Sequence, residues 1–547
     1  MRTKLIPKQI LGRLPWTAEA YQHWLGDGKP PAGGYELNRL ASHLPGWIKA
    51  ARSARQAAET ASASRRILLV GGLQWWVEHL VAMGLVLTAE GHRVDLAYVP
   101  YRRWIDPVDR FDLRRQQAYL RQVLRPLQGT MGLIDLTAAP GAALDAELEA
   151  SIRCQADLDT QYTLQREAMD LDRDPEAERL FRLRLERNRT AGRAVKRLLI
   201  ESSYDSVVIP NGSILEFGAA YRTARAAGQT TVTYEFGEQR GRMWLAQNDE
   251  VMRLRSQALW EARGQAALET SEMAALETLY QARRGGQAWA QFARQWQAGE
   301  SQGARAARQK LGLPEGKKLV LLCTNVVGDS LALDRQIFTQ GMADWLVKTA
   351  LHLADREDCL LVVRVHPGEL LGAGHPSREI LHNSLPELAE KVVLVPPESD
   401  VNTYDLIDLA HVGLVYTTTV GMEMAMAGVP VVVAGDTHYR GKGFTTDPES
   451  LTAYFEAIDR LVAEPLNRRL PQDQIDSAVR YAYRFFFEFP FAYPWHIVSF
   501  WDDMADLPLE EAVQPETRRR YDEALTALSG VPVDWGARQT APISEAA

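Results

Sequence analysis

The sequence is poor in cysteine, and it lacks both long hydrophobic runs and an excess of positive charge. Its three cysteines, Cys154, Cys323 and Cys359, lie far apart and form no CxxC pair. Neither a zinc knot nor a disulfide framework is indicated, and a reducing cytoplasm fits this usage. No stretch reaches the roughly 18 apolar residues that a membrane-spanning helix needs. We expect a cytoplasmic protein, for which peripheral contact with the inner face of a membrane stays open.

The net charge and the length of the chain further limit its possible partners and its domain organisation. The formal net charge of −8 offers no positive surface for a polyanion to follow, so nucleic acid is not an expected partner. At 547 residues and 46% hydrophobic composition, the chain is too long for one core and predicts at least two domains. The sequence contains no GxSxG elbow, no P-loop and no HExxH helix. Hydrolase, ATPase and zincin functions therefore lose their simplest support.

Two Asp-x-Asp runs are the only metal-like signatures that we find. They lie at 157–159 and within 170–174, in a charged stretch of helical pattern and not at the end of a strand. We interpret both as solvated helix faces. No metal site is expected, and no cofactor.

The N-terminal half predicts an α/β lobe behind a helical extension, which covers residues 1–64. The lobe itself spans 65–250 and includes a helical insertion at about 145–200. Short apolar runs that alternate with segments of helical length indicate β-α-β units, and such units normally build a parallel sheet. The strands are predicted at 65–72, 92–100, 204–210 and 230–242, with helices at 75–91 and 214–228.

The C-terminal half predicts a second lobe of the same kind at 315–480, reached through a helical bridge at 251–314. Its strands are predicted at 317–323, 359–367, 391–396, 411–416 and 429–435. They are continuous apolar runs, as expected when helices cover both faces of a sheet. The predicted fold class is α/β of the GT-B kind: two Rossmann-like, doubly wound lobes with helical insertions and a cleft between them.

The chain beyond the second lobe predicts crossover helices at 481–530 and a disordered tail at 531–547. The aromatic run at 483–501 is expected to pack against both lobes as part of the crossover. Contact with a lipid-linked acceptor at a membrane surface is the alternative for this run.

Ligands of open α/β sheets bind beyond the carboxyl ends of the strands, and polar residues gather there in the C-terminal lobe. Arg364 and His366 end one strand, and an imidazole there can donate to a phosphate oxygen. Another strand is followed by three threonines at 417–419 and then by a helix that starts near Val420. Hydroxyls and free N–H groups at such a start suit a pyrophosphate, and Glu423 is placed to accept hydrogen bonds from a ribose.

A third group of polar residues follows the last predicted strand of this lobe, in the loop at 435–448. Its glycines and cations suit a flexible, donor-rich loop, a lip of the site, that binds a charged sugar or a phosphate. Structural interpretations stay open for all three places. The threonines can be helix caps, the histidine can be satisfied by backbone groups, and the loop can simply be solvated.

The order of these motifs resembles a family. "RVHPGE" followed by "YTTTVGMEMAMAGVPVVVAGDTHYRGKGFT" is similar to the C-terminal lobe of capsule-polysaccharide biosynthesis glycosyltransferases, which include the Kdo-adding enzymes of bacterial capsule assembly. The resemblance covers about 315–450, and it implies a GT-B fold and a nucleotide-sugar donor. The donor-binding residues expected from motif and resemblance together are Arg364, His366, Thr417, Thr418, Thr419, Gly421, Glu423, Tyr439, Gly441, Lys442, Gly443 and Thr445.

Two departures from the family's patterns limit what can be carried over. Retaining GT-B transferases have a second glutamate eight residues before Glu423, and Val415 stands there in this sequence. The stereochemical outcome is therefore not carried over. The loop sequence Ala-Gly-Trp of the family is Arg-Gly-Lys here, at 440–442. The identity of the donor sugar is not carried over either.

Strand ends of the N-terminal lobe supply the acceptor side. An attacking hydroxyl needs a base, and Glu235 is the first choice for this catalytic role because it ends a predicted strand. Glu78 and Glu216 are weaker choices, since both lie in helical patterns, and a plain surface glutamate is the alternative for Glu235. His366 is the second catalytic candidate. The expected acceptor-binding residues are Gly72, Gln74, Asn211, Gly212, Glu238, Arg240 and Arg242.

The sequence thus predicts a metal-independent transferase. A sugar would move from a nucleotide-sugar donor to a surface, capsular or lipid-linked glycan. A nucleotide-sugar epimerase or a polyol-phosphate transferase on the same fold is one alternative. A non-catalytic scaffold of envelope assembly is another. Product analysis separates them, because an epimerase needs no acceptor.

Overall fold

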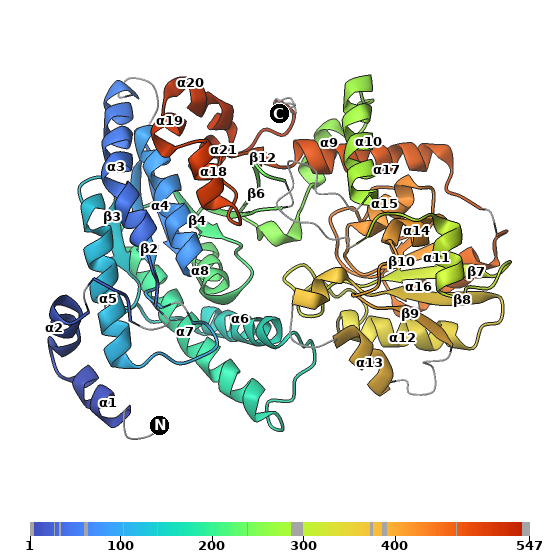
Figure 1. Cartoon of the computed structure of the whole chain (residues 1–547), viewed down its shortest axis with the longest axis horizontal. Coiled ribbons are helices and arrows are strands. Elements are labelled where there is room, and N and C mark those ends of the chain that lie inside the picture. The colour runs from blue at the N-terminus through green and yellow to red at the C-terminus, as the bar shows by residue number, and fades with distance from the viewer. Residues whose placement is uncertain are drawn as a thin grey trace. The chain divides into compact units, whose positions relative to one another are not determined.

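The chain forms two compact units. The computed structural model describes residues 5–26, 28–31, 34–58, 64–101, 103–138, 140–237, 239–285, 299–371, 376–384, 391–466 and 468–538. The first unit holds Met1–Thr160, Asp170–Met252 and Phe491–Val533, and the second holds Gln161–Met169, Arg253–Pro490 and Asp534–Ala547. Figure 1 shows their helices and strands.

The first unit is built on a seven-stranded sheet with the order β12-β6-β5-β4-β1-β2-β3. The five strands from β5 to β3 are parallel, whereas β6 and β12 are antiparallel to their neighbours. The strands are β1 (Arg66–Gly71), β2 (Arg93–Tyr98), β3 (Gly132–Asp135), β4 (Ser206–Pro210), β5 (Thr231–Glu235), β6 (Arg242–Gln247) and β12 (Phe491–Ala492). The segment predicted as one strand at 230–242 contains the whole of the parallel strand β5 and the first residue of the antiparallel strand β6.

Helices cover this sheet and extend from it. α4 packs on β1 and β2, α8 packs on β4, and α3 and α7 pack on these two helices in turn. The helices are α1 (Leu5–Arg13), α2 (Thr17–Trp24), α3 (Asn38–Ala58), α4 (Gln74–Ala89), α5 (Arg110–Leu124), α6 (Ala146–Leu164), α7 (Pro175–Glu201), α8 (Leu215–Ala226), α18 (Phe500–Asp506), α19 (Leu509–Ala512), α20 (Pro515–Arg518) and α21 (Asp522–Leu528), with 3₁₀ turns at Arg125–Leu127, Val251–Arg253 and Arg519–Tyr521.

The second unit is built on a five-stranded sheet with the order β11-β10-β7-β8-β9, and all its pairs are parallel. Its strands are β7 (Lys318–Cys323), β8 (Cys359–Arg364), β9 (Val392–Val395), β10 (Ala410–Val415) and β11 (Val431–Val433). The prediction of two doubly wound α/β lobes is therefore confirmed at the level of each unit.

Helices surround the second sheet as well. They are α9 (Gln257–Arg263), α10 (Thr270–Arg284), α11 (Ala304–Lys310), α12 (Met342–Ala354), α13 (Pro376–Ser384), α14 (Thr403–Leu409), α15 (Val420–Met426), α16 (Leu451–Ala463) and α17 (Gln472–Tyr483), with a 3₁₀ turn at Pro367–Leu371 and a π-helical turn at Arg484–Glu488. Local sequence sets several helix starts. The Asn402 side chain accepts from Tyr404 N–H at α14, and the Ser450 side chain accepts from Ala453 N–H at α16.

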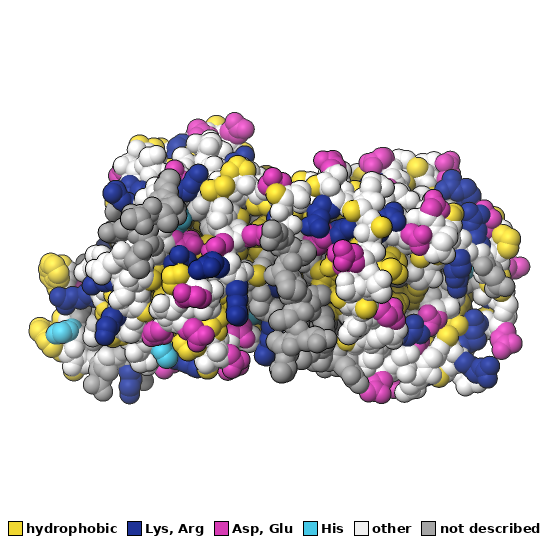
Figure 2. All heavy atoms as spheres, turned by 90° about the horizontal axis from the view of Figure 1, so that it is seen from above, with side chains coloured by type: hydrophobic (Ala, Val, Ile, Leu, Met, Phe, Trp, Pro, Cys, Tyr) yellow, Lys and Arg dark blue, Asp and Glu magenta, His cyan; other side chains and the backbone are white. Residues whose placement is uncertain are grey.

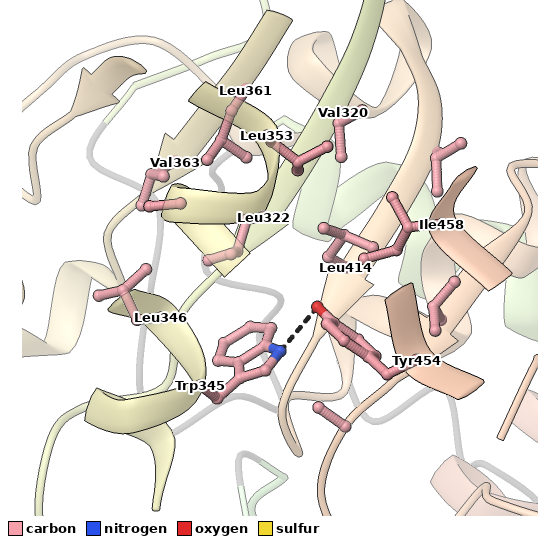
Figure 3. Packing of buried hydrophobic residues seen from close by; sticks show 14 of the residues in the cluster. Val320, Leu322, Trp345, Leu346, Leu353, Leu361, Val363, Leu414, Tyr454 and Ile458 are labelled. Atoms are coloured by element: carbon pink, nitrogen blue, oxygen red, sulfur yellow. Dashed lines mark hydrogen bonds between the residues drawn. The ribbon is translucent and has the colours of Figure 1, made fainter. Parts of the chain in front are cut away.

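The core of the second unit explains why its strands are uniformly apolar. Side chains of β7, β8 and β10 meet those of α12 and α16 in one buried cluster (Figure 3). Within it the Trp345 indole N–H donates to the Tyr454 hydroxyl at 2.7 Å, so the one polar pair in the view is satisfied. This packing fixes the positions of the three strands whose ends carry the site residues.

The C-terminal segment returns to the first unit. Phe491 pairs with Met243 of β6, and the aromatic side chains of Phe487, Phe489 and Trp495 are buried. Most side chains of the aromatic run at 483–501 are thus buried, and Val498 is 54% exposed. Among the described residues, no helix is long and apolar enough to cross a bilayer.

Two predictions about outlying segments are wrong. The tail was expected to be disordered from 531, but Arg538 donates to the carbonyl of Pro490 and Trp535 stacks on Phe489. The rest of that prediction, 539–547, lies outside the described residues. In the run 157–159, expected to be a solvated face, Asp159 is fully buried and accepts from Asn188 Nδ2 at 2.6 Å. A buried partner on a distant helix is invisible to a helical pattern.

Candidate functional site

Both sheets have a topological switch point, and the predicted site residues flank it in each unit. In the second unit the chain starts at β7, runs outward to β8 and β9, and then returns to place β10 and β11 on the other side of β7. In the first unit β1 and β4 form the corresponding pair. Ligands of doubly wound sheets bind at this point, beyond the carboxyl ends of the strands. The switch point of each unit is therefore its candidate site.

Three strands of the second unit end level with each other. Cys323 of β7 pairs with Val415 of β10 on one side and with Arg364 of β8 on the other. The residues after these strands consequently form a row, which we call the strand-end row and define as Thr324, Asn325, His366, Thr417, Thr418 and Thr419. Hydrogen bonds join it: Thr417 N–H donates to Asn325 Oδ1 at 3.2 Å, and His366 N–H donates to Thr324 Oγ1 at 3.0 Å.

Thr324 and Asn325 were missed by the sequence reasoning. Both are buried and hold their neighbours in the row through the two hydrogen bonds above. Their position directly after the apolar run at 317–323 could have indicated them as site residues. A polar pair after a strand is common in turns, so the sequence alone did not distinguish it.

His366 is a neutral hydrogen-bond donor in this arrangement. The Gly368 N–H donates to His366 Nδ1 at 2.9 Å, which leaves the ring proton on Nε2. Burial, together with the positive charge of Arg364, lowers the pKa of His366 to about 4. A neutral imidazole with its proton on Nε2 suits donation to a phosphate oxygen, whereas a role as general base has no support in this geometry.

The last two threonines of the row keep their hydroxyls available. Thr419 caps α15 without a side-chain hydrogen bond, and in the described part of the chain neither the Thr418 nor the Thr419 hydroxyl bonds to protein. The Thr417 hydroxyl, in contrast, donates to the carbonyl of Leu331 at 2.8 Å. Of the three predicted hydroxyl contacts, the geometry leaves two for a ligand and assigns the third to packing.

Two other residues predicted to bind the donor instead support the strand-end row through hydrogen bonds to backbone carbonyls. Arg364 is buried, and its guanidinium donates to the carbonyl of Pro396 at 2.7 Å. Tyr439 is buried, and its hydroxyl donates to the carbonyl of Thr418 at 2.7 Å. A Cβ at Gly421 would lie 2.4 Å from that hydroxyl, so glycine is required there for packing. These residues differ from the expectation because burial separates them from a ligand.

The loop at 435–448 is bonded mainly to itself. Thr445 Oγ1 donates to Asp447 Oδ1 at 2.8 Å, and Gly441 N–H donates to Asp447 Oδ2 at 2.7 Å. Lys442 is buried and its ammonium contacts the Gln257 side chain. Gly441 and Gly443 adopt positive φ values of 73° and 89°, which favour glycine. In this structure the expected donor-rich lip is a loop braced by its own hydrogen bonds, and its Lys442 faces protein.

Glu423 also differs from the expected open position. Its side chain is 1% exposed, and its Oε1 accepts from Arg283 Nε at 2.7 Å and from the Tyr404 hydroxyl at 3.0 Å. Arg283 lies on α10, far from Glu423 in the sequence, so a local sequence pattern cannot predict this ion pair. The arginine and the tyrosine both bond to Oε1, and protein atoms cover the whole carboxylate. In this structure Glu423 is a buried partner of α10.

Cations lie near the end of β11. Asp436 follows this strand, and its carboxylate pairs with Arg255 at 3.3 Å and with Arg253 at 3.6 Å. The Arg255 side chain is about half exposed. Sequence reasoning treated this segment as a bridge and named neither arginine. Both are sources of positive charge in the same unit as the strand-end row.

In the first unit the structure brings Asn211 and Glu235 together. Asn211 follows β4 with a positive φ of 58°, and its Nδ2 donates to Glu235 Oε2 at 2.9 Å. The Phe236 N–H donates to Glu235 Oε1 at 3.0 Å. Gly212, with a φ of 82°, lies close to Thr233. A partly exposed carboxylate is thus fixed at the carboxyl end of β5 by two donors.

The other predicted acceptor residues are more scattered. Gly72 directly follows β1 and packs near Phe217. The Gln74 side chain is tied to the backbone of Glu36 by two hydrogen bonds. Arg240 is exposed, and Arg242 begins β6 with partial burial. Glu238 lies outside the described residues. The structure therefore groups Asn211, Gly212 and Glu235, and it does not add the others to that group.

Neither of the weaker base candidates competes with Glu235. Glu216 is paired with Arg184 at 2.9 Å and accepts from the Tyr101 hydroxyl, and the charge of Arg184 contributes to lowering its pKa despite burial. Glu78 is 5% exposed and is covered by Trp501, whose indole N–H donates to it at 3.3 Å.

Glu78 gives a prediction about stability. Burial raises its pKa to about 7, so the folded state binds its proton more tightly than the unfolded chain. The stability that protonated Glu78 contributes to the folded state is fully present below about pH 4.5, and it is lost as the pH rises through 7. We expect Glu78→Gln to be more stable than wild type by about 3 kcal/mol at pH 8 and equal to it near pH 4.5. Denaturant unfolding at both pH values measures this, with the exposed Glu516→Gln as control, and equal stability of Glu78→Gln and wild type at pH 8 would contradict it.

Comparison with known proteins gives a family match in the second unit. The model of the family of capsule polysaccharide biosynthesis proteins matches residues 253–464, which lie entirely within that unit. No curated protein matches the chain.

Solved structures show weaker likenesses. The beta Kdo 2,4 transferase KpsC of Thermosulfurimonas dismutans aligns at 16% identity and a TM-score of 0.33, covering 52% of this chain and 81% of that one. Its beta Kdo 2,7 transferase aligns at 15% identity and a TM-score of 0.31, covering 55% and 82%. The UDP-GlcNAc 2-epimerase of Neisseria meningitidis, bound to UDP-GlcNAc, aligns at 12% identity and a TM-score of 0.23, covering 76% and 94%.

Superpositions at these TM-scores carry no argument about activity, so the assignment depends on the family match. That match contains both motifs from which the resemblance was drawn, at 364–369 and at 416–445. The predicted resemblance is confirmed over residues 253–464, the part of the second unit that matches the model of the family of capsule polysaccharide biosynthesis proteins.

Proposed function

We propose that the chain is a glycosyltransferase. Its second unit would bind a nucleotide-sugar donor, and its first unit would bind a glycan or lipid-linked glycan acceptor. The observation that carries the proposal is the strand-end row. Available hydroxyls follow β10 and a neutral imidazole donor follows β8, the two strands that flank β7 at the switch point of a parallel sheet, inside the part of the chain that matches the family. Ligands with phosphate groups bind at such places.

The proposed leaving group is the nucleotide's phosphate. The hydroxyl groups of Thr418 and Thr419 would donate hydrogen bonds to phosphate oxygens, and His366 would donate a hydrogen bond from Nε2. Arg255, which pairs with Asp436 beyond the end of β11, would add positive charge. These donors are fixed before the reaction, so they stabilise the charge that develops as the bond to the sugar breaks. Because protein groups can supply this stabilisation, we propose that transfer requires no metal ion.

The acceptor would be activated in the first unit. Glu235 is held by Asn211 and by the N–H of Phe236, and both donors favour the ionised carboxylate. An ionised, partly exposed carboxylate can take the proton of a sugar hydroxyl as that hydroxyl attacks the anomeric carbon. Asn211 would act as a positioning residue in this step. Glu235 is proposed as the catalytic base.

The donor site is tested through His366. We expect His366→Ala to weaken nucleotide-sugar binding by about tenfold or more, because one hydrogen bond to a charged phosphate is lost. Since the pKa of His366 is about 4, wild-type affinity should stay constant between pH 5.5 and pH 8. Calorimetric titration with UDP-, GDP- and CMP-linked sugars measures both effects.

His352→Ala is the matched control for this titration. His352 lies on α12 of the same unit and pairs with Asp459, away from the strand-end row. It should leave affinity unchanged. No binding of any nucleotide to the wild-type protein would refute the proposal. Product analysis with the donor that binds then distinguishes transfer to an acceptor from epimerisation, from transfer of a polyol phosphate and from binding without turnover.

A further inference from the structure

The two N-terminal helices contact the first unit through polar side chains that pair with α5. Lys8 of α1 pairs with Asp112 of α5 at 2.7 Å, and Glu19 of α2 accepts from Arg114 Nε of α5 at 3.0 Å. Ala18 and Gln22 are the buried residues of α2. In an ordinary surface helix the large apolar side chains face the protein. α2 reverses this arrangement, and charged pairs hold α1 and α2 on the first unit.

The large apolar side chains of this region face outward. Trp16 is 78% exposed, Trp24 is 77% exposed and Leu25 is 71% exposed. Seven of the sixteen large apolar side chains that are exposed in the described part of the chain lie between residues 10 and 25, so the concentration is local. Figure 2 shows hydrophobic side chains on the part of the first unit formed by α1 and α2. We call this surface the N-terminal apolar patch; it consists of Ile10, Leu11, Leu14, Trp16, Tyr21, Trp24 and Leu25.

Positive charge accompanies the patch. Residues 1–31 contain five Lys or Arg and two Asp or Glu, although the chain as a whole has eight more acidic than basic residues. Arg13 and Lys29 are exposed, and neither forms an ion pair with a described residue. Both acidic partners that the described part supplies here, Glu19 and Asp112, are already bound by Arg114 and Lys8. The surface is therefore apolar, aromatic and positively charged.

We propose that the N-terminal apolar patch docks the chain on an anionic lipid surface. Exposed tryptophans and tyrosine suit the headgroup region of a bilayer, where an apolar ring and a polar edge are both accommodated. Amphipathic helices that lie in this region combine such a face with basic residues. Anionic lipids attract the basic residues, and this attraction weakens with salt.

A second copy of the chain is a less suitable occupant. A symmetric dimer through this patch would bring the same basic segment of each copy face to face. Nothing in the patch supplies acidic groups to offset that repulsion, since Glu19 is turned toward Arg114. A lipid surface with negative headgroups satisfies both the apolar and the charged part of the patch. The inference concerns docking alone and is independent of the proposed transferase activity.

The experiment is vesicle flotation of the full chain with two variants. Vesicles of phosphatidylcholine with phosphatidylglycerol in equal amounts are compared with phosphatidylcholine alone. We expect binding to the anionic vesicles that weakens in high salt, and a loss of at least about tenfold in the partition coefficient for Trp16→Ser/Trp24→Ser. The control is Ile200→Ser/Leu351→Ser, which removes two exposed apolar side chains elsewhere and should bind like wild type.

Circular dichroism establishes that both variants are folded, and light scattering reports their oligomeric state. Failure of the wild-type chain to float with anionic vesicles would overturn the proposal. Equal flotation of the tryptophan variant and the control would also overturn it. So would a wild-type dimer that the tryptophan variant converts to a monomer without any change in flotation, because the patch would then be a contact between copies.

Discussion

Glu235→Gln is expected to lower the turnover of sugar transfer by about 10²–10⁴-fold, because the acceptor hydroxyl loses the group that takes its proton. Affinity for the nucleotide sugar should not change, since the donor is assigned to the strand-end row of the second unit. Glutamine is close in shape to glutamate and can still accept from Asn211, so the fold around β5 is retained. Steady-state kinetics, with calorimetry for the donor, separate the two effects.

Two further variants sharpen this test. Asn211→Ala removes the amide that holds the carboxylate, and a partial loss of turnover is expected. Asn211→Asp should be worse than Asn211→Ala, because a second carboxylate would repel Glu235. Glu147→Gln, at an exposed carboxylate of α6, is the control and should behave as wild type. Turnover of Glu235→Gln within about threefold of wild type would remove Glu235 from the catalytic role.

Arg283→Ala is expected to destabilise the second unit by about 3–5 kcal/mol, because it leaves the buried Glu423 carboxylate without its charged partner. The pair is almost fully covered, with the Glu423 side chain 1% exposed. The double variant Arg283→Met/Glu423→Gln removes both charges and keeps an acceptor for the Tyr404 hydroxyl. It should recover most of the lost stability, as measured by denaturant unfolding.

The same pair tests how Glu423 is used. If the carboxylate serves mainly as the partner of α10, then Glu423→Gln alone should affect stability more than donor affinity. Arg284→Ala is the matched control, because Arg284 lies next to Arg283 on α10 and pairs with Asp408, which is partly exposed. That surface pair should contribute about 1 kcal/mol or less. If Arg283→Ala proves no more destabilising than Arg284→Ala, the buried pair does not have the role described here.

The fold was accessible from the sequence because its strands are short continuous apolar runs. The runs at 317–323 and 411–416 correspond to β7 and β10 within a residue or two. Their order also allowed the doubly wound sheets to be predicted, since each run alternates with a segment of helical length. The return of the chain to the first unit at Phe491 was anticipated only as a crossover, and its antiparallel pairing with β6 was not.

The site was accessible only in part, and burial explains the difference. Residues placed directly after strands, such as His366, Thr418 and Thr419, lie where the pattern predicted. Residues that lie further beyond the strand ends, such as Glu423 and Lys442, contact side chains from segments that are distant in the sequence. A sequence pattern predicts the element that carries a side chain. It does not reveal a partner that the tertiary fold brings from elsewhere, as Arg283 shows.

The proposed donor site requires that the strand-end row receives the phosphates of a nucleotide. A crystal of the protein soaked with a mixture of nucleotide sugars measures this directly. The predicted result is density for the phosphates within hydrogen-bond distance of the Thr418 and Thr419 hydroxyls and of His366 Nε2. A nucleotide bound elsewhere in the chain, with the strand-end row filled only by water, would contradict the central claim.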